Sequence, residues 1–321
     1  MSKPTKNMAG SVRDRLKALS RERGEDFHLI LTRYGLERLL YRLGRSEYAE
    51  RFVLKGAMLF ALWTETVHRP TKDLDLLGYG DVSAPELRTL FERICQVEVE
   101  PDGIVFEPNS IRVEDIREDQ EYQGRRVKLN GKLGQAKIDL QLDIGFGDVI
   151  TPEAQEIEYP TLLELPPPRI RAYPKESVVS EKLQAMVFLG MVNSRMKDFY
   201  DLWVMSRKFS FAGETLTKAI KATFERRKTA IPEEIPPALS QEFTRDRNKA
   251  AQWQAFLNRT GLSDEGKGLP GVIEDLRIFL EPLLVAAKGG RFTFSVWTPE
   301  GKWQARKKPV SEQYILSGSE D

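Results

Sequence analysis

Apolar residues recur at helical spacing in the first and last parts of this chain. In the first fifty residues they lie three or four positions apart, as in Leu36, Leu39 and Leu43, and this spacing places them on one face of a helix. We therefore predict helices over residues 11–48. The same spacing returns in the second half of the chain and predicts helices over 177–191, 197–207, 216–224, 247–257 and 272–285.

The middle of the chain has a different pattern, in which apolar and polar residues alternate. Alternation places successive side chains on opposite faces of a strand. Between residues 103 and 145 the alternating stretches are separated by Gly, Asn and Pro, which predicts successive antiparallel strands. The predicted strands cover 52–54, 73–77, 104–106, 111–116, 125–129, 136–144 and 292–297, with shorter helices over 58–63 and 85–97.

The segment Leu165–Pro168, which ends in three prolines, separates the alternating part of the chain from the later helices. Proline-rich segments are stiff and extended, so they often act as spacers. We predict two lobes, with a division between residues 165 and 166. Residues 1–165 would hold the first helices and a mixed or antiparallel sheet, and residues 166–321 would be helical, which is an α+β fold.

Aspartates stand out on two of the predicted strands. Asp73 and Asp75 alternate with leucines, so both carboxylates share one face, and Asp139 and Asp143 do the same on a later strand. Clustered carboxylates are costly unless a hard cation neutralises them, and Mg²⁺ is commonly held by carboxylates together with substrate phosphates. The pattern predicts metal-dependent phosphoryl or nucleotidyl transfer. Asp143 is preferred to Asp139 as the third carboxylate because it ends its strand beside a glycine turn.

Basic residues near these aspartates suggest contacts to phosphate. Lys55 and Gly56 lie at a strand-to-helix turn, where glycine lets the backbone approach a triphosphate and lysine adds positive charge. Lys182, on a predicted helix, is a candidate phosphate contact with Asp198 as its partner. Helical spacing also places Arg195 one turn from Asp198.

The overall charge is nearly balanced, with 49 Lys and Arg against 48 Asp and Glu in 321 residues. This balance argues against a strongly basic nucleic-acid binder. The charge is uneven, however, with basic positions at Arg226, Arg227, Lys228, Lys302, Arg306, Lys307 and Lys308. A basic region beside an acidic metal site would suit a polyanionic substrate.

The remaining composition excludes several classes of protein. Cys95 is the one cysteine, so an intrachain disulfide is impossible, and two histidines argue against a histidine-rich zinc site. No apolar run approaches the ~18 residues that a membrane-spanning helix needs. The first residues lack the apolar core of an export signal. We expect a cytoplasmic protein with no membrane partner.

These motifs, taken in order, resemble the AbiEii/AbiGii nucleotidyltransferase toxins, a family that includes the MenT toxins of mycobacteria. The resemblance covers nearly the whole chain, and it rests on the segments Tyr34–Leu40, Phe52–Ala57, Arg69–Leu76, Asp143–Asp148, Glu181–Leu183 and Ser194–Leu202. Each motif alone is weak, and their common order makes the match specific.

The resemblance implies a DNA polymerase β-like nucleotidyltransferase core followed by a helical C-terminal lobe. It also implies the toxin of a toxin–antitoxin or abortive-infection system against phage, controlled by a cognate antitoxin. Members of the family transfer nucleotides from an NTP, in some cases to the acceptor end of tRNA. The family's metal carboxylates fall on Asp73 and Asp75, its lysine on Lys182 and its later aspartate on Asp198.

The chain departs from the wider superfamily at one turn, where Gly56-Ala57 stands in place of Gly-Ser. The serine hydroxyl is missing, so backbone N–H groups, Lys55 or Thr71 would have to contact phosphate. We assign metal binding to Asp73, Asp75 and Asp143, catalysis to Asp73, Asp75, Lys182 and Asp198, and nucleotide binding to Lys55, Gly56, Ala57, Arg69, Thr71 and Arg195.

Three alternatives remain at this stage. The acceptor could be a small molecule or a protein in place of RNA. The chain could also be a catalytically silent module that binds a nucleotide or an antitoxin.

Overall fold

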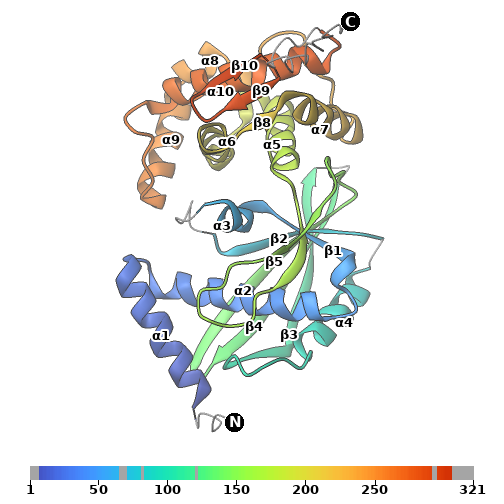
Figure 1. Ribbon diagram of the computed structural model, residues 1–321, viewed down its shortest axis with the longest axis vertical. Coiled ribbons are helices and arrows are strands. Elements are labelled where there is room, and N and C mark those ends of the chain that lie inside the picture. Colours follow the sequence, from blue (N-terminus) through green and yellow to red (C-terminus); the bar gives the residue numbers. More distant parts are fainter. Residues whose placement is uncertain (1–6, 65–70, 81–82, 120–121, 291–294, 306–321) are drawn as a thin grey trace, which may run out of the picture.

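The computed structural model describes residues 7–64, 71–80, 83–119, 122–290 and 295–305 (Figure 1). The helices are α1 (Met8–Arg23), α2 (Phe27–Arg45), α3 (Phe60–Trp63), α4 (Ala84–Cys95), α5 (Lys175–Leu189), α6 (Met196–Lys208), α7 (Gly213–Arg226), α8 (Gln241–Arg245), α9 (Arg247–Thr260) and α10 (Gly268–Ala287). The strands are β1 (Phe52–Lys55), β2 (Asp73–Gly78), β3 (Ile104–Asp119), β4 (Tyr122–Leu133), β5 (Ala136–Phe146), β6 (Gln155–Glu158), β7 (Arg169–Ala172), β8 (Phe211–Ala212), β9 (Val296–Thr298) and β10 (Lys302–Gln304).

Within these ranges the first lobe is built on a sheet of seven strands in the order β3-β4-β5-β2-β1-β7-β6. β2 runs parallel to β5 and β1 runs parallel to β7, whereas the other neighbours are antiparallel. The predicted mixed sheet is therefore confirmed. The parallel pairing of β2 with β5 is the one that matters for the site, because it brings Asp73 and Asp75 beside the strand that carries Asp143.

The predicted strands over 104–106 and 111–116 are one strand, β3. Its pairing with β4 shifts register between Glu107 and Arg112, and the hydroxyl of Ser110 donates to the carbonyl of Glu107 at 2.6 Å. The interruption in the alternating pattern therefore marks a bulge inside a strand and not a turn between two strands.

Helix α2 packs on the apolar face of the sheet (Figure 1). Gly35 makes the approach close, because a Cβ at this position would lie 2.9 Å from Cδ2 of Leu140 on β5. Leu140 and Ile144 are buried on this face. Asp139 and Asp143 alternate with them along β5, so they project from the opposite face of the sheet.

The second lobe consists of α5 to α10 and a small sheet that, among the described residues, has the order β10-β9-β8. Phe279 of α10 lies at its centre, with ring centroids 5.4 Å from Phe211 and 4.7 Å from Trp297. β9 contains the end of the strand predicted over 292–297. Residues 292–294 of that prediction lie outside the described residues.

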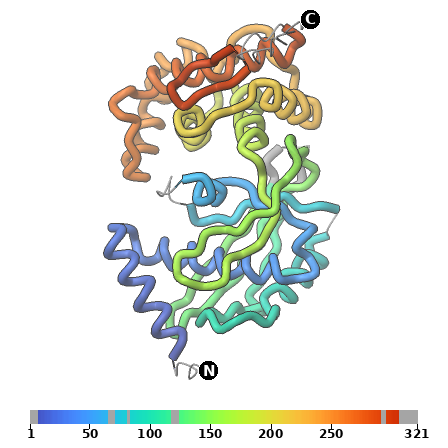
Figure 2. Tube along the Cα trace, in the orientation of Figure 1, coloured from blue at the N-terminus to red at the C-terminus, as the bar shows by residue number. Residues whose placement is uncertain are grey.

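The sheet continues past the proline run. Leu54 of β1 pairs with Ala172 of β7, and α5 begins at Lys175. The chain passes from the first lobe to the second at this connection (Figure 2). We therefore propose that the lobes divide between Ala172 and Lys175, somewhat later than the division expected after residue 165. No helix of the described ranges is both long and apolar enough to cross a lipid bilayer.

Candidate active site between the lobes

A row of charged residues crosses the face of the sheet that α2 leaves uncovered. Each residue lies directly opposite the next on a neighbouring strand, so their side chains share one face. In order from β3 to β1 the row is Glu114, Arg126, Asp143, Asp75 and Lys55. The charges alternate except at the centre, where the carboxylates of β5 and β2 are neighbours.

Gly56 is required by the position of Asp75. Its φ is +74°, and a Cβ built on it would lie 1.9 Å from Oδ2 of Asp75. Only glycine combines this backbone conformation with so close an approach. Ala57 follows as a buried residue and also lines the site. The turn between β1 and the next helical segment is thus shaped around the Asp75 carboxylate.

Asp75 lies in an environment that disfavours its charge. Burial is the main reason that the pKa of its carboxyl rises to about 6, and the nearby Asp143 and Asp73 raise it further against the opposing effect of Lys55 and Lys197. Asp73 lies two positions along β2, on the same face. Such a cluster stores repulsion that a cation would relieve.

The two candidates for the third carboxylate have different surroundings. Asp143 lies opposite Asp75, and both of its oxygens accept hydrogen bonds from Arg126, at 2.8 and 2.7 Å. The Asp139 side chain is 79% exposed and pairs with Lys137 at 3.1 Å. Asp143 thus lies beside Asp75 and Asp139 does not, and the role of Asp143 as the third carboxylate stays a prediction.

The carboxylates do not yet form a closed metal site. Among the residues that the structure describes, no group of three or more Asp, Glu, His or Cys side chains converges on one point. Asp143 is directed at Arg126, which leaves Asp73 and Asp75 as a pair. A pair fits Mg²⁺, since this ion is commonly held by one or two carboxylates and completed by substrate phosphates and water.

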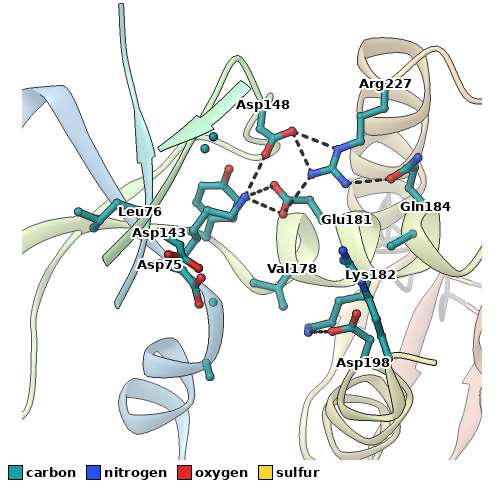
Figure 3. A pocket seen from close by; sticks show the side chains of 18 of the residues that line it. Asp75, Leu76, Asp143, Asp148, Val178, Glu181, Lys182, Gln184, Asp198 and Arg227 are labelled. Carbon is teal, nitrogen blue, oxygen red and sulfur yellow. Dashed lines mark hydrogen bonds and ion pairs between the residues drawn. The ribbon is translucent and has the colours of Figure 1, made fainter. Parts of the chain in front are cut away.

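A cavity of about 570 Å³ opens in front of these residues, between the sheet and α5, α6 and the end of α7 (Figure 3). One side carries charged groups, and Asp75 and Asp143 lie together there. Apolar residues from the sheet and from α5 also line the cavity, namely Ile116, Phe146, Val178, Ala185, Phe188 and Leu189. A cavity lined by both charged and apolar residues suits a ligand with both a phosphate and a planar base.

Four charged side chains connect the lobes at one edge of the cavity. We call Lys55, Asp148, Glu181 and Arg227 the interlobe ion cluster. Nζ of Lys55 lies 3.0 Å from Asp148 and 2.9 Å from Glu181, and a guanidinium nitrogen of Arg227 lies 3.0 Å from Asp148 and 3.4 Å from Glu181. Figure 3 shows the side chains of Asp148, Glu181 and Arg227 converging from the two lobes.

The pairing alters two sequence-based expectations. Burial lowers the pKa of Lys55, but Glu181 and Asp148 outweigh it and raise that pKa well above its usual value. The ammonium predicted to meet phosphate is thus already held by two carboxylates. Arg227, expected on a basic surface, is also in the cluster, and the neighbouring Arg226 donates to the carbonyl of Gly147.

The interlobe ion cluster gives a testable prediction about stability. Asp148 accepts from both Lys55 and Arg227 and its side chain is 7% exposed. Asp148→Asn would leave two buried cations poorly paired, and we expect it to lower the free energy of unfolding by about 3 kcal/mol. Urea denaturation would measure this, with Asp139→Asn as a surface control expected to stay within about 0.5 kcal/mol. Equal effects from the two variants would contradict the structural role of the cluster.

Lys182 lies on the helical side of the cavity. Its ammonium is 2.5 Å from Asp198 and 2.9 Å from Asp201, both on α6. The predicted contact between Lys182 and Asp198 is therefore present, and Asp201 adds a second, fully buried carboxylate. Two aspartates nearly one helical turn apart hold the lysine in place from one face of α6.

The other predicted nucleotide contacts divide into three cases. Arg195 lines the cavity. Thr71 does not, and its hydroxyl donates to the carbonyl of Asp73 at 3.2 Å, so its present contact shapes the start of β2. Arg69 lies outside the described residues. Sequence reasoning missed Arg126 and Asp148, because their importance depends on which residues face them on distant strands.

The model of the family "Nucleotidyl transferase AbiEii toxin, Type IV TA system" matches residues 38–275. No curated protein matches the chain.

Two crystal structures from Helicobacter pylori are similar, one described as that of a suggested nucleotidyltransferase and the other as that of JHP933. Each is 16% identical to this chain, with a TM-score of 0.45. Each match covers 78% of this chain, and it covers 93% of the first H. pylori chain and 90% of the second. The family match spans most of the present sequence and includes every residue of the charged row. The chain belongs to the AbiEii family of nucleotidyltransferase toxins of type IV toxin–antitoxin systems.

Proposed function

We propose that this nucleotidyltransferase moves a nucleotide from an NTP to RNA, with the 3′ acceptor end of tRNA as its substrate and Mg²⁺ as its cofactor. The observation that carries the proposal is the placement of Asp75. Its carboxylate is held against Gly56, beside Asp73 and Asp143, at the wall of a cavity that Lys182 enters from the opposite lobe.

In this reaction the 3′-hydroxyl oxygen of the acceptor forms a bond to the α-phosphorus of the NTP. The bond from that phosphorus to the bridging oxygen breaks, and pyrophosphate leaves. Bound Mg²⁺ would supply Lewis-acid stabilisation of the phosphoryl oxygens and of the leaving group. Asp73 and Asp75 would hold it.

The chain's own groups would supply the rest of the chemistry. Lys182 places a positive charge near the triphosphate, and Asp198 and Asp201 fix its position. Burial raises the pKa of the Asp75 carboxyl to about 6, and a bound cation would favour its charged form, so the proton of the attacking hydroxyl would pass to water. The apolar residues that line the cavity would receive the base.

A basic strip on the same face of the sheet supports a polyanionic acceptor. Asp73 pairs across the sheet with Gln141, Gln141 with Lys128, and Lys128 with Arg112. Lys128 is half-exposed and pairs with Glu114 at 2.8 Å, and Arg112 is exposed. Basic side chains that extend from the carboxylates are placed to follow a phosphodiester backbone.

The proposal is tested by incubating the protein with Mg²⁺, total RNA and one labelled NTP at a time. We expect label on tRNA-sized RNA with at least one NTP, and no label after periodate has oxidised the 3′-terminal ribose. Sequencing of RNA 3′ ends from cells that express the protein would identify the acceptor. Label on a protein or a small molecule, or on no acceptor with any NTP, would overturn the RNA assignment.

Membership of a toxin–antitoxin family supports a cognate antitoxin as a partner of this protein. We propose that a cognate antitoxin restrains it in the cytoplasm, and that release inhibits growth and limits phage. Co-expression with the neighbouring gene should restore growth that the toxin alone arrests. Growth arrest that persists whichever neighbouring gene is supplied would count against this partner.

A further inference from the structure

The strongest unexplained contact in the site is the pair formed by Arg126 and Asp143. Nε of Arg126 donates to Oδ1 at 2.8 Å and a terminal nitrogen donates to Oδ2 at 2.7 Å, so both oxygens of the carboxylate are engaged. The two residues lie directly opposite each other on β4 and β5. Asp143 is opposite Asp75 on its other side. The carboxylate thus stands between a fixed cation and the proposed metal pair.

Other contacts on β3 and β4 leave Arg126 directed at this carboxylate. Glu114, its partner on β3, pairs with Lys128 at 2.8 Å. The hydrogen bonds that Arg126 donates to Asp143 are the main reason that the pKa of Arg126 is raised, and the charge of Asp73 contributes as well. The guanidinium therefore already balances part of the negative charge of the row. A two-point pairing of this kind is among the stronger hydrogen-bonded interactions in proteins.

We propose that Arg126 is an internal counter-cation that occupies Asp143 in place of a divalent metal, and that full metal binding requires Asp143 to exchange Arg126 for the ion. This inference rests on the proposed function, since it concerns the same metal site. It explains why three aspartates share one face of neighbouring strands without converging. Arg126 stabilises the row of charges when metal is absent, and it raises the concentration of metal that is needed to fill the site.

The test measures metal affinity and not turnover. Free Mn²⁺ is counted by electron paramagnetic resonance in titrations of the full-length protein, without nucleotide or RNA. Arg126→Gln removes the competing charge, and we expect Mn²⁺ to bind about tenfold more tightly, which corresponds to about 1.4 kcal/mol. Lys132→Gln is the matched control, because it removes the same charge from the same face of β4 at a position six residues from Arg126, roughly 20 Å away, and should change the affinity less than about twofold.

Two further variants isolate the role of the carboxylate. Asp143→Asn should weaken Mn²⁺ binding, and Arg126→Gln should give no gain in an Asp143→Asn background. In EDTA, Arg126→Gln should melt below the native protein and regain the difference when Mn²⁺ is added. If it does not fold, Arg126→Lys keeps the charge without the two-point geometry, and a gain of about twofold to threefold is expected.

Each outcome decides the matter. Equal affinities for Arg126→Gln and Lys132→Gln, or native affinity in Asp143→Asn, would overturn the exchange. Absence of Mn²⁺ binding by the native protein would overturn both the exchange and the metal dependence of the proposed function. The predicted gain in affinity, combined with no nucleotide transfer to any acceptor, would support the exchange while removing the proposed reaction.

Discussion

Asp75→Asn is expected to lower the rate of nucleotide transfer by roughly 1,000-fold or more and to abolish growth arrest. The amide keeps the shape of the carboxyl group but removes the charge that Asp73 and Asp75 would offer to the metal. Transfer is measured by the incorporation of labelled NTP at saturating Mg²⁺. Asp139→Asn, on the exposed part of β5, is the matched control and should retain native activity.

The fold of the Asp75→Asn variant should be intact. Burial and neighbouring carboxylates disfavour the charged form of Asp75, so its neutralisation in metal-free protein should leave the melting temperature unchanged or raise it. Loss of transfer with a native or higher melting temperature would assign the defect to chemistry. Full toxicity of Asp75→Asn, or equal defects in Asp75→Asn and Asp139→Asn, would refute the assignment.

Lys182→Met should reduce kcat/KM for the NTP by roughly 100-fold, because the variant lacks the positive charge that the helical lobe presents to the triphosphate. It should also destabilise the protein by about 3 kcal/mol, since Asp198 and Asp201 would remain as buried carboxylates without their lysine. Steady-state kinetics at varied NTP concentration and urea denaturation measure the two effects separately.

A second substitution separates the chemical role of Lys182 from its structural role. Lys182→Met combined with Asp201→Asn removes one of the unpaired carboxylates, so much of the stability should return. Transfer should not return, because the charge is still absent. If transfer recovers together with stability, Lys182 acts only by supporting the fold.

The local parts of the site could be predicted from the sequence. A strand alternates with a period of two whatever it pairs with, so the shared face of Asp73 and Asp75 follows from their spacing alone. Gly56 at the end of an apolar strand likewise indicates a turn of special conformation. In both cases the deciding information lies within a few residues.

The parts that could not be predicted depend on register and on lobe packing. The position of Arg126 opposite Asp143 follows from how β4 pairs with β5, and a shift of one residue would send Arg126 to the other face. The sequence alone presents Lys55 as a cation available to phosphate, whereas its ion-pair partners, Asp148 and Glu181, lie far along the chain. No local pattern indicates such contacts.

The interlobe ion cluster limits how the sequences of the two lobes can diverge during evolution. Lys55 belongs to the sheet and Glu181 to the first helix of the second lobe, and each keeps the other's charge balanced. A mutation at either position leaves an uncompensated charge, so lineages should change the two together. Chimaeras that exchange helical lobes between relatives should therefore keep residues 55 and 181 from the same parent.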